Sequence, residues 1–439
     1  MHSIATNQLN IMHCHNEQPE KMHRVIRSNF RRYSTLAWGE GADGKLGLGT
    51  EMASRDPQPI AELEGKTVKS LSAGAFHSVA VVADGSDAVG RIYTWGSNYY
   101  GQAGFMPQTR GMIADEMLLN PSEFTENMQS ESIKAVKCGD FHSIALAESG
   151  TVFSWGAGLL GCGNEYFDSR PVELKFPDGW AVSDILAKRG LSLALITNSV
   201  LDETRLYIWG TFDDANGKRL KAKSPVGVKL PVKLPRIHAI DSDGHLIVVW
   251  GSREDGLDTL VVLGSPAVIP NDIPYSPDIQ DVESVTDTVE LPVVQIIKMD
   301  NTLNPVKAVY LVERAVVVVR SDGAIQVVTL FGQSVTLDNL TSIGPIDKLA
   351  VGPHILAAVT TTGNVFEWKV DIEPPKQHEN QSWFSWLLSK AKKKTKDESV
   401  GTQNSVSLLE AIEEHGPSHK TTGVKLIAVG WNHSICSTK

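Results

Sequence analysis

Three histidines recur in nearly the same local sequence, and they are the first residues here whose type and spacing suggest chemistry. His77, His142 and His433 lie in the segments GAFHSVA, GDFHSIA and GWNHSI. A histidine can act as a general base or bind a metal ion. However, no nucleophile–base pair or carboxylate pair stands out near them. We therefore expect each histidine to hydrogen-bond a neighbouring loop and predict that the chain is not an enzyme, although a site assembled from distant loops stays open.

The segment GEGADGK at residues 39–45 has the spacing of a glycine-rich phosphate loop. A P-loop needs serine or threonine after its lysine to bind magnesium, but Leu46 follows here, and the two acidic residues of the loop would repel phosphate. Similar loops recur as GSNYYG at 96–101 and GAGLLG at 156–161. We interpret all three as elements of a repeat and expect no nucleotide and no other cofactor.

The four cysteines (Cys14, Cys138, Cys162 and Cys436) lie far apart and lack the spacing of a metal site. This usage favours a reducing compartment without a disulfide framework. The triplet His-Cys-His at 13–15 is an alternative metal ligand set, but we expect no resident metal there. A net charge of −10 argues against the DNA backbone as a ligand. No apolar run reaches the eighteen residues of a membrane-spanning helix.

Internal repeats decide the expected fold. The segments at residues 72–104 and 137–163 each read as an apolar strand, a glycine turn and a second strand ending in Trp-Gly, the pattern of a β-hairpin. Three markers each recur seven times. The ends of the second strand are Trp38-Gly39, Trp95-Gly96, Trp155-Gly156, Trp209-Gly210, Leu263-Gly264, Phe331-Gly332 and Glu367-Trp368. The preceding strands are expected to begin at His77, His142, Leu191, His245, Ala315, His354 and His433. Upstream aliphatic pairs are Val68/Leu71, Ile133/Val136, Val182/Ile185, Ile237/Ile240, Val306/Val309, Ile346/Leu349 and Val424/Ile427.

The order of these markers predicts how the repeats close. The first Trp-Gly strand, 35–39, has no histidine strand before it, and the last histidine strand, 430–435, has no Trp-Gly strand after it. Pairing the two would complete one blade and leave no edge strand open. We therefore predict an all-β, seven-bladed β-propeller, closed by the N-terminal strand and the C-terminal blade.

The motifs GxxHS(V/I)A and WGxxxxGQxG resemble the regulator-of-chromosome-condensation repeat. The resemblance covers about residues 35–439, and the pattern is eroded from residue 190 onward. It implies a propeller that either catalyses guanine-nucleotide exchange on a small GTPase or serves as a binding scaffold. Among such proteins the chain looks most like divergent fungal mitochondrial members.

The first 33 residues resemble a targeting signal. From Met22 the chain is rich in arginine (Arg24, Arg27, Arg31 and Arg32) and has no acidic residue before Glu40, as mitochondrial presequences do. Cleavage is expected after Tyr33, so residues 34–439 would form the propeller domain. Glu17 and Glu20 weaken the signal unless translation starts at Met12 or Met22, and a disordered basic tail is the alternative.

Two segments are expected to interrupt the repeats. Residues 265–304 are rich in proline and acid and read as a long loop. Residues 371–422 read as a short helical insertion in the last blade, with a second helix over 407–416. Its aromatic and basic residues suit an anionic membrane interface or, equally, a partner protein: Trp383, Phe384, Trp386, Leu387, Lys390, Lys392, Lys393 and Lys394.

Together these features predict a non-enzymatic scaffold on the matrix side of the mitochondrial inner membrane. The expected partners are subunits or assembly factors of a respiratory complex, with the bc1 complex as the best single guess, which follows from the resemblance. Two alternatives remain: an exchange factor for a mitochondrial GTPase, and a scaffold bound to the mitochondrial ribosome.

Overall fold

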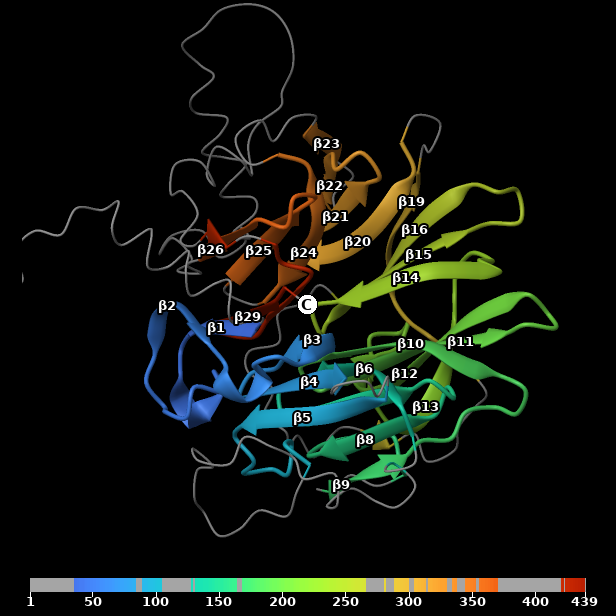
Figure 1. Ribbon diagram of the computed structural model, residues 1–439. Helices are drawn as coiled ribbons and strands as arrows, with labels where there is room; N and C mark the ends of the chain where they lie inside the picture. Colours follow the sequence, from blue (N-terminus) through green and yellow to red (C-terminus); the bar gives the residue numbers. More distant parts are fainter. Residues whose placement is uncertain are drawn as a thin grey trace, which may run out of the picture.

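Seven β-sheets surround a common centre in the computed structural model of this chain (Figure 1), as the repeats predict. The structure describes residues 35–83, 89–104, 128, 131–163, 168–265, 280–281, 288–299, 304–312, 315–329, 334–337, 344–352, 355–369, 420–421 and 423–438. Within this part of the chain, no helix is long and apolar enough to cross a membrane. The fold is therefore all-β, a seven-bladed propeller.

Each blade is an antiparallel sheet whose first strand lies innermost. In the described residues, blade 1 has three strands: β3 (Thr67–Ala73), β4 (His77–Ala83) and β5 (Gly90–Gly96). Blade 2 has four: β6 (Ile133–Cys138), β7 (His142–Ala147), β8 (Val152–Gly156) and β9 (Asp168–Glu173). Blade 3 is built on β10 (Ala181–Lys188), β11 (Leu191–Asn198), β12 (Glu203–Asp213) and β13 (Arg219–Lys229).

The remaining blades repeat this order. Blade 4 contains β14 (Arg236–Ser242), β15 (Leu246–Ser252), β16 (Asp258–Gly264) and β19 (Val293–Lys298). Blade 5 contains β20 (Val306–Val312), β21 (Ala315–Arg320), β22 (Ile325–Thr329) and β23 (Ser334–Leu337). Blade 6 contains β24 (Ile346–Val351), β25 (Ile355–Thr360), β26 (Val365–Lys369) and β27 (Lys420–Thr421). Blade 7 contains β28 (Leu426–Val429), β29 (His433–Ser437), β1 (Thr35–Gly39) and β2 (Ser54–Pro59).

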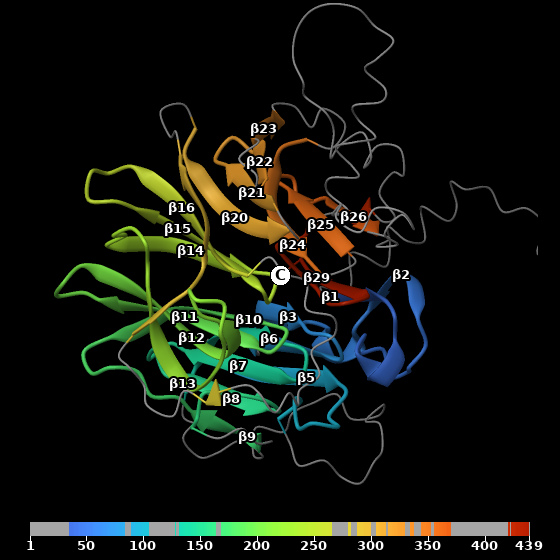
Figure 2. The same cartoon turned by 180° about the vertical axis from the view of Figure 1, so that it is seen from behind.

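Blade 7 joins the two ends of the sequence, as predicted. β1 pairs with β29 in antiparallel register, with Trp38 opposite Ser434 and Gly39 opposite His433. Figures 1 and 2 show these strands side by side from both sides of the ring. Gly39 has a φ of 108°, and a Cβ added there would lie 2.4 Å from the Asn432 carbonyl oxygen. The closing strand therefore requires glycine at this position.

The spacing of three in the aliphatic pairs has a structural cause. A plain strand returns to the same face every second residue. In the innermost strands of blades 1 to 6, the register shifts directly after the first aliphatic residue, for example between Val68 and Ser70 and between Ile133 and Ala135. A β-bulge adds one residue to the strand, so members three apart share one face. Val182 and Ile185, for instance, are both buried in the same cluster.

The hydrophobic core lies between neighbouring blades. Trp38 and Leu36 of blade 7 pack against Val359 and Val365 of blade 6. Similar clusters join blades 7 and 1, blades 1 and 2, blades 2 to 4, and blades 4 and 5. At these seams each blade buries apolar side chains against the next one, and ring closure gives blade 7 such a neighbour on both sides.

The segment 265–304, expected to be a loop, contains strands and in this respect the prediction was wrong. Its part 293–298 forms β19, the outer strand of blade 4. Two shorter strands, β17 (Gln280–Asp281) and β18 (Thr288–Glu290), pair in parallel with β13 of blade 3. The chain thus leaves blade 4, covers the edge of blade 3, and returns. The outer edge of blade 3 is thereby paired and not open. The hydrophobic periodicity of the sequence does not predict this pairing.

Most of the second predicted insertion lies outside the described residues. Of 371–422, only the two residues of β27 are described, and they pair with β26. The predicted helical insertion with its second helix over 407–416, like the presequence at 1–33, falls outside this part of the chain. Two short 3-10 turns lie between described strands, η1 (Ala42–Gly44) and η2 (Ala61–Leu63).

Two of the expected strand positions differ from the structure in the eroded blades. Leu246, and not His245, lies opposite Gly264, so His245 belongs to the preceding turn. In blade 5, Ala315 lies opposite Thr329, whereas the sequence pattern predicts the strand end at Phe331-Gly332. Phe331-Gly332 and His354 themselves lie outside the described residues. The sequence pattern in these blades lacks the Trp-Gly and Gly-x-x-His marks that fix the register elsewhere.

Candidate partner-binding face

The strand pairing gives the ring two unlike faces. Within a blade, the turn between the first and second strands lies beside the end of the third strand, because His77 pairs with Gly96 and His142 with Gly156. We call the side that carries these turns and the connections from third to fourth strands the loop face. The opposite side, which carries the hairpins between second and third strands, is the hairpin face.

The recurring histidines link neighbouring blades at the loop face. His433 Nε2 lies 2.9 Å from Ser78 Oγ, His77 Nε2 lies 2.7 Å from Ser143 Oγ, and His142 Nε2 lies 2.7 Å from Ser192 Oγ. In each case the serine belongs to the second strand of the next blade. We call these three pairs His–Ser links. We had expected a neighbouring loop as the partner, and the structure shows a strand of the next blade instead.

The loop at residues 39–45, predicted to be an element of the repeat, supports the His–Ser links through its backbone. The Lys45 carbonyl accepts hydrogen bonds from Ser78 Oγ at 3.1 Å and from Trp95 Nε1 at 3.0 Å. The Gln102 carbonyl accepts the same pair of bonds in blade 2. The Lys45 side chain is only 5% exposed and pairs with Glu40 at 3.1 Å. Lys45, the lysine of the P-loop-like sequence, thus contributes to the packing of blade 7 against blade 1.

These hydrogen bonds determine the histidine tautomer. The Ser78 hydroxyl proton goes to the Lys45 carbonyl, so the ring of His433 must donate from Nε2. Burial lowers the pKa of His77 to about 3, of His142 to about 4 and of His433 to about 3. A neutral imidazole that is hydrogen-bonded to serine holds two neighbouring strands in position. Because its pKa is so low, it suits neither a general acid nor a general base at neutral pH.

The links stop at blade 3. The histidine position is taken by Leu191, Leu246, Ala315 and Ile355 in blades 3 to 6. In blade 7 the serine position is still serine, but Ser434 Oγ is buried and has no hydrogen-bond partner among the described residues. The His–Ser links are therefore confined to one arc of the ring, from blade 7 through blade 3.

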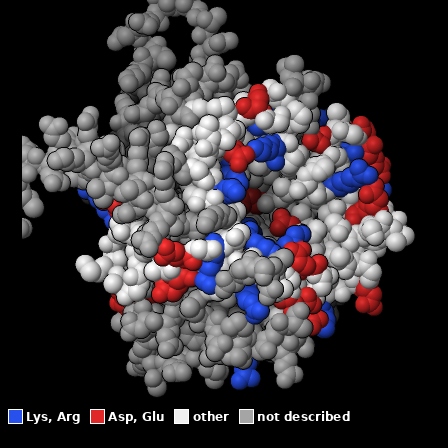
Figure 3. Space-filling model, viewed as in Figure 1, with Lys and Arg blue, Asp and Glu red and all other residues white. Residues whose placement is uncertain are grey.

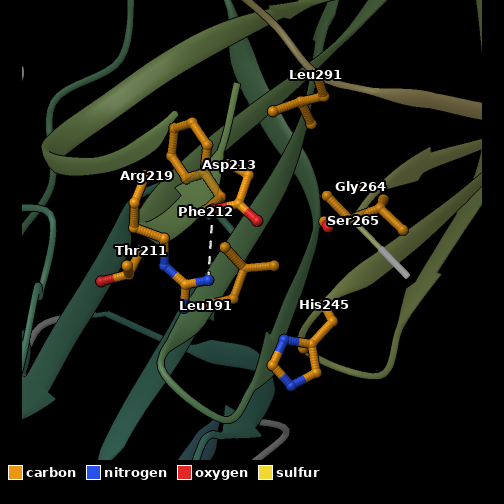
Figure 4. Close-up of a pocket in the computed structure, with 11 residues that line it drawn as sticks. Leu191, Thr211, Phe212, Asp213, Arg219, His245, Gly264, Ser265 and Leu291 are labelled. Carbon is orange, nitrogen blue, oxygen red and sulfur yellow. Dashed lines mark hydrogen bonds and ion pairs between the residues drawn. The ribbon is translucent and has the colours of Figure 1, made fainter. Parts of the chain in front are cut away.

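A narrow cleft opens on the loop face at the first seam without a link, between blades 3 and 4. Leu191 and Ile247 contribute to its wall and occupy the positions of the missing histidine and serine. Figure 4 shows Arg219 paired with Asp213 at 3.4 Å on one wall and His245 on the other. The lining residues are Leu191, Thr211, Phe212, Asp213, Arg219, Gly244, His245, Ile247, Gly264, Ser265 and Leu291.

Charged side chains of both signs gather around the central hollow that Figure 3 shows on this view of the ring. Lys188 donates to the Val351 carbonyl at 2.9 Å, which joins blade 3 to blade 6 across the centre. The Lys188 side chain is partly buried, and this burial lowers its pKa, while the negative charge of Asp241 opposes the effect. Asp241 in turn accepts from the Leu311 amide at 2.8 Å.

A contiguous group of aromatic side chains lies on the loop face over blades 7, 1 and 2. Phe76 stacks on Phe141 at 5.2 Å between centroids and lies 6.4 Å from Trp431. Tyr100 contacts Phe141 edge-on at 5.0 Å and Tyr99 at 4.8 Å. We call these five residues the aromatic patch. Tyr99 is 61% exposed, Tyr100 41% and Phe141 38%.

The repeat pattern by itself does not predict the aromatic patch, although the sequence carries a signal for it. The residue one or two places before the histidine is Phe76, Phe141 or Trp431 in the three repeats that keep the histidine. An aromatic residue that recurs beside the same turn of neighbouring blades is the signal that predicts such a patch.

The predicted contact residues and presequence residues fall outside the described part of the chain: Trp383, Phe384, Trp386, Leu387, Lys390, Lys392, Lys393, Lys394, Arg24, Arg27, Arg31, Arg32 and Tyr33. Within the described ranges, no group of three His, Cys, Asp or Glu side chains is close enough to hold a metal ion. The candidate functional site that the structure itself offers is the loop face with its aromatic patch.

Comparison with protein families agrees with the repeat pattern. The regulator of chromosome condensation (RCC1) repeat matches residues 34–81 and 89–146, and a second model of the same repeat matches 68–102 and 133–164. RCC1 repeats therefore extend over residues 34–164 of this propeller. The matched repeats are those of blades 7, 1 and 2, where both the His–Ser links and the aromatic patch lie.

The similarity to curated relatives covers only part of each relative. The ultraviolet-B receptor UVR8 of Arabidopsis thaliana is 30% identical over 44% of this chain and 42% of the receptor. The mitochondrial RCC1 domain-containing protein RUG3 of the same plant is 29% identical over 40% of each chain. The E3 ubiquitin-protein ligase HERC2 of Homo sapiens is 28% identical over 50% of this chain but only 4% of the ligase. The chain therefore spans less than half the length of each of these relatives.

Solved structures confirm the propeller over most of the chain. Prp20p of Saccharomyces cerevisiae, studied for its binding to Gsp1p and histones, superposes with a TM-score of 0.61 over 92% of this chain and 91% of that one, at 14% identity. Human WBSCR16 superposes with a TM-score of 0.58 over 92% and 98%, also at 14% identity. At this identity the likeness establishes the fold alone.

Proposed function

We propose that this RCC1-repeat propeller is a non-enzymatic scaffold that binds a client protein through the aromatic patch on its loop face. The exposure of Tyr99, Tyr100 and Phe141 beside one another carries this proposal. Aromatic residues are enriched at the cores of protein interfaces, and contiguous exposed apolar patches mark binding sites. The buried His–Ser links and bulged inner strands hold the turns that present these rings, so the site is preorganised.

We further propose that the scaffold acts in mitochondria, as an assembly factor of an inner-membrane respiratory complex. The arginine-rich segment 22–33 supports mitochondrial import, and the relative RUG3 is itself mitochondrial. The bc1 complex is our preferred client, on the resemblance to fungal mitochondrial members. The segment with Trp383 and Trp386 is our candidate for attachment to the matrix side of the membrane.

Affinity purification from isolated mitochondria in gentle detergent tests both levels of this proposal. The tagged chain is compared with a Tyr100→Ser/Phe141→Ser variant and with a Val200→Ser/Leu201→Ser control. Val200 is 91% exposed and Leu201 57% exposed, and both lie on the hairpin face. We expect respiratory-complex subunits with the wild type and the control, and a loss of at least tenfold with the patch variant. Equal recovery from all three chains would refute a role for the patch.

Membrane attachment has its own test. We expect binding to cardiolipin-containing liposomes to fall in a Trp383→Ala/Trp386→Ala variant. Absence of binding by the wild-type chain, together with normal localisation of the variant, would remove the membrane part of the proposal and leave the scaffold part standing.

A guanine-nucleotide exchange factor is the second candidate, because the resemblance to RCC1-repeat proteins includes exchange factors. Acceleration of labelled GDP release from mitochondrial GTPases would favour it, and no acceleration at saturating propeller would exclude it for the GTPases tested. Co-sedimentation with a ribosomal subunit would instead favour the ribosome-bound alternative.

A further inference from the structure

The outermost strands of the blades differ in how their edges are protected. In the described residues six blades have a fourth strand, and the backbone groups on the outer side of such a strand can pair with another chain. β2 contains Pro57 and Pro59, and β9 contains Pro171, and proline lacks the amide that an added strand would bond. The edge of β13 is covered by β17 and β18. β23 has four residues and β27 has two, so their edges are short.

β19 (Val293–Lys298), the fourth strand of blade 4, has none of these protections. Its sequence VVQIIK is six residues long, contains no proline, and has four β-branched aliphatic residues and a single charge at its end. Val294 and Ile297 pack against the cluster between blades 4 and 5. Val293 is 49% exposed, however, and Ile296 is 43% exposed. A proline-free apolar strand at the edge of a sheet is a typical site of pairing with another chain.

The backbone of β19 directs hydrogen-bonding groups away from its blade at every second residue. The Met299 amide, directly after the strand, donates to the Asp258 carbonyl of β16 at 2.9 Å, and the last four residues of β19 pair with β16 in regular register. Since backbone groups alternate along a strand, those of Ile297 also face β16, and those of Ile296 and Lys298 face outward. In Figure 1, β19 follows β16 as the last strand of blade 4. Within the described part of the chain, no residue hydrogen-bonds to these outward groups.

We propose that the outer edge of β19 receives an extended segment of a client protein as a fifth strand of blade 4. The outward N–H and C=O groups of Ile296 and Lys298 bond the main chain of that segment, and the exposed aliphatic side chains of β19 contact its apolar side chains. Alternating main-chain donors and acceptors match another extended chain, so the segment is proline-free and rich in aliphatic residues. This site is separate from the aromatic patch and does not rest on it.

A second copy of the chain fits this edge less well than a client segment does. A strand of six residues gives a contact line of roughly 20 Å. The blades radiate from a common centre (Figure 1), so two rings that met edge to edge would diverge on both sides of that line. A stable interface between folded proteins buries about 1,000 Å² or more, which one short strand does not supply. A client segment can continue beyond the strand along the surface of the ring.

Amide hydrogen exchange on the full chain tests whether the edge is open. The exchange is resolved residue by residue by mass spectrometry with electron-transfer fragmentation. We expect the amides of Ile296 and Lys298 to exchange at least about tenfold faster than the amide of Ile297, which faces β16. Equally slow exchange at all three amides would show that the edge is already covered, and the inference would then be wrong.

Peptide selection tests the occupant. A randomised twelve-residue library displayed on phage is selected on the full chain, and an Ile296→Pro variant is the counter-target. Proline at this residue removes an outward amide and no bond to β16, and thermal unfolding shows whether the variant retains the fold. We expect proline-free, aliphatic peptides that bind the wild type at least about tenfold more tightly than Ile296→Pro. Ile296→Thr is the matched control, since it keeps the amide and a β-branched side chain, and it should lose no more than about threefold.

N-methylated versions of a selected peptide test strand addition on the unaltered chain. A methyl group on an amide that faces β19 removes a donor and blocks pairing, whereas a methyl group on the alternate amides points away from the edge. We therefore expect one alternating set of N-methyl groups to weaken binding at least about tenfold and the other set to leave it nearly unchanged. Equal binding of the two methylated peptides would overturn the inference even if Ile296→Pro did not fold.

Two further outcomes would also overturn it. One is the selection of peptides that bind the wild type and a folded Ile296→Pro variant equally well. The other is a concentration-dependent mass of the chain that Ile296→Pro abolishes, which would replace the client with a second copy. The scaffold proposal fails or stands separately, because Ile296→Pro leaves the aromatic patch intact and Tyr100→Ser/Phe141→Ser leaves β19 intact.

Discussion

Acidification should weaken the ring through its buried histidines. His77, His142 and His433 have pKa values of about 3, 4 and 3 in the folded chain, because burial disfavours the imidazolium. An unfolded histidine has a pKa of about 6.5. The unfolded state therefore binds more protons between these values. The stabilisation by neutral histidine is complete above pH 6.5 and is lost as the pH falls toward 4 and 3.

The size of the effect follows from the same values. At pH 5 an unfolded histidine is almost fully protonated and a folded one is not, which costs about 2 kcal/mol per residue and about 6 kcal/mol for the three. This is a large part of a typical unfolding free energy of roughly 5–15 kcal/mol. Carboxylates also respond to pH, so the test must isolate one histidine.

A His77→Leu variant isolates one link, since leucine already occupies this position in blade 3. At pH 7.5 we expect it to be less stable by about 1–2 kcal/mol, because the link is lost while Ser143 still donates to the Gln102 carbonyl. Between pH 7.5 and 5.0 it should lose about 2 kcal/mol less than the wild type, because it has one fewer buried histidine to protonate.

Urea unfolding followed by tryptophan fluorescence at the two pH values measures this difference. Ser434→Ala serves as the matched control, because it changes the same row of positions without removing a histidine, and it should show the full loss of the wild type. If the wild type and His77→Leu lost the same free energy within about 0.5 kcal/mol, the assignment of His77 as a buried neutral link would be wrong.

Other predictions concern single groups. Ser434→Ala should change the unfolding free energy by no more than about 0.5 kcal/mol, because its hydroxyl has no partner among the described residues. Ser143→Ala should lower the unfolding free energy by about 1–2 kcal/mol, and a larger loss in Ser434→Ala than in Ser143→Ala would contradict this contrast. Gly39→Ala should destabilise the chain by at least about 2 kcal/mol in thermal or urea unfolding, because its φ of 108° and the carbonyl 2.4 Å from the new Cβ both oppose it; a neutral effect would mean that the ring is not closed as described. Burial raises the pKa of Cys138 to about 12, so at pH 8 iodoacetamide should label the half-exposed Cys162 and spare Cys138 in the native chain, as read by peptide mass spectrometry; equal labelling would show that blade 2 opens readily.

The closure of the ring could be predicted from the sequence because its marks survive at both ends. Trp38-Gly39 and His433-Ser434 keep the full pattern, and these residues do pair. Blades 3 to 6 lack the Gly-x-x-His mark, and the aliphatic residues of their second strands fit more than one register. This is why His245 was assigned to a position that Leu246 occupies.

The contacts that create the candidate site could not be predicted from one blade. His77 meets Ser143 across 66 residues, and Trp431 meets Asp140 across 291. Local pattern identifies each residue type, but the partner depends on the angle between blades, which the sequence pattern does not contain. The strands β17 and β18 were missed for the same reason, since they pair with the outer edge of another blade.

The order of synthesis gives the joining of β1 to β29 a further consequence. Thr35 and Ser437, which meet in blade 7, are 402 residues apart. At roughly 5–20 residues per second, the ribosome needs about 20–80 s to make the intervening chain. Throughout that time β1 has no inner neighbour, and its apolar residues stay exposed to other nascent chains and to proteases. We therefore expect chaperones to bind most strongly to the unfinished polypeptide. A stop codon only a few residues before β29 should lead to degradation of almost all of the truncated protein.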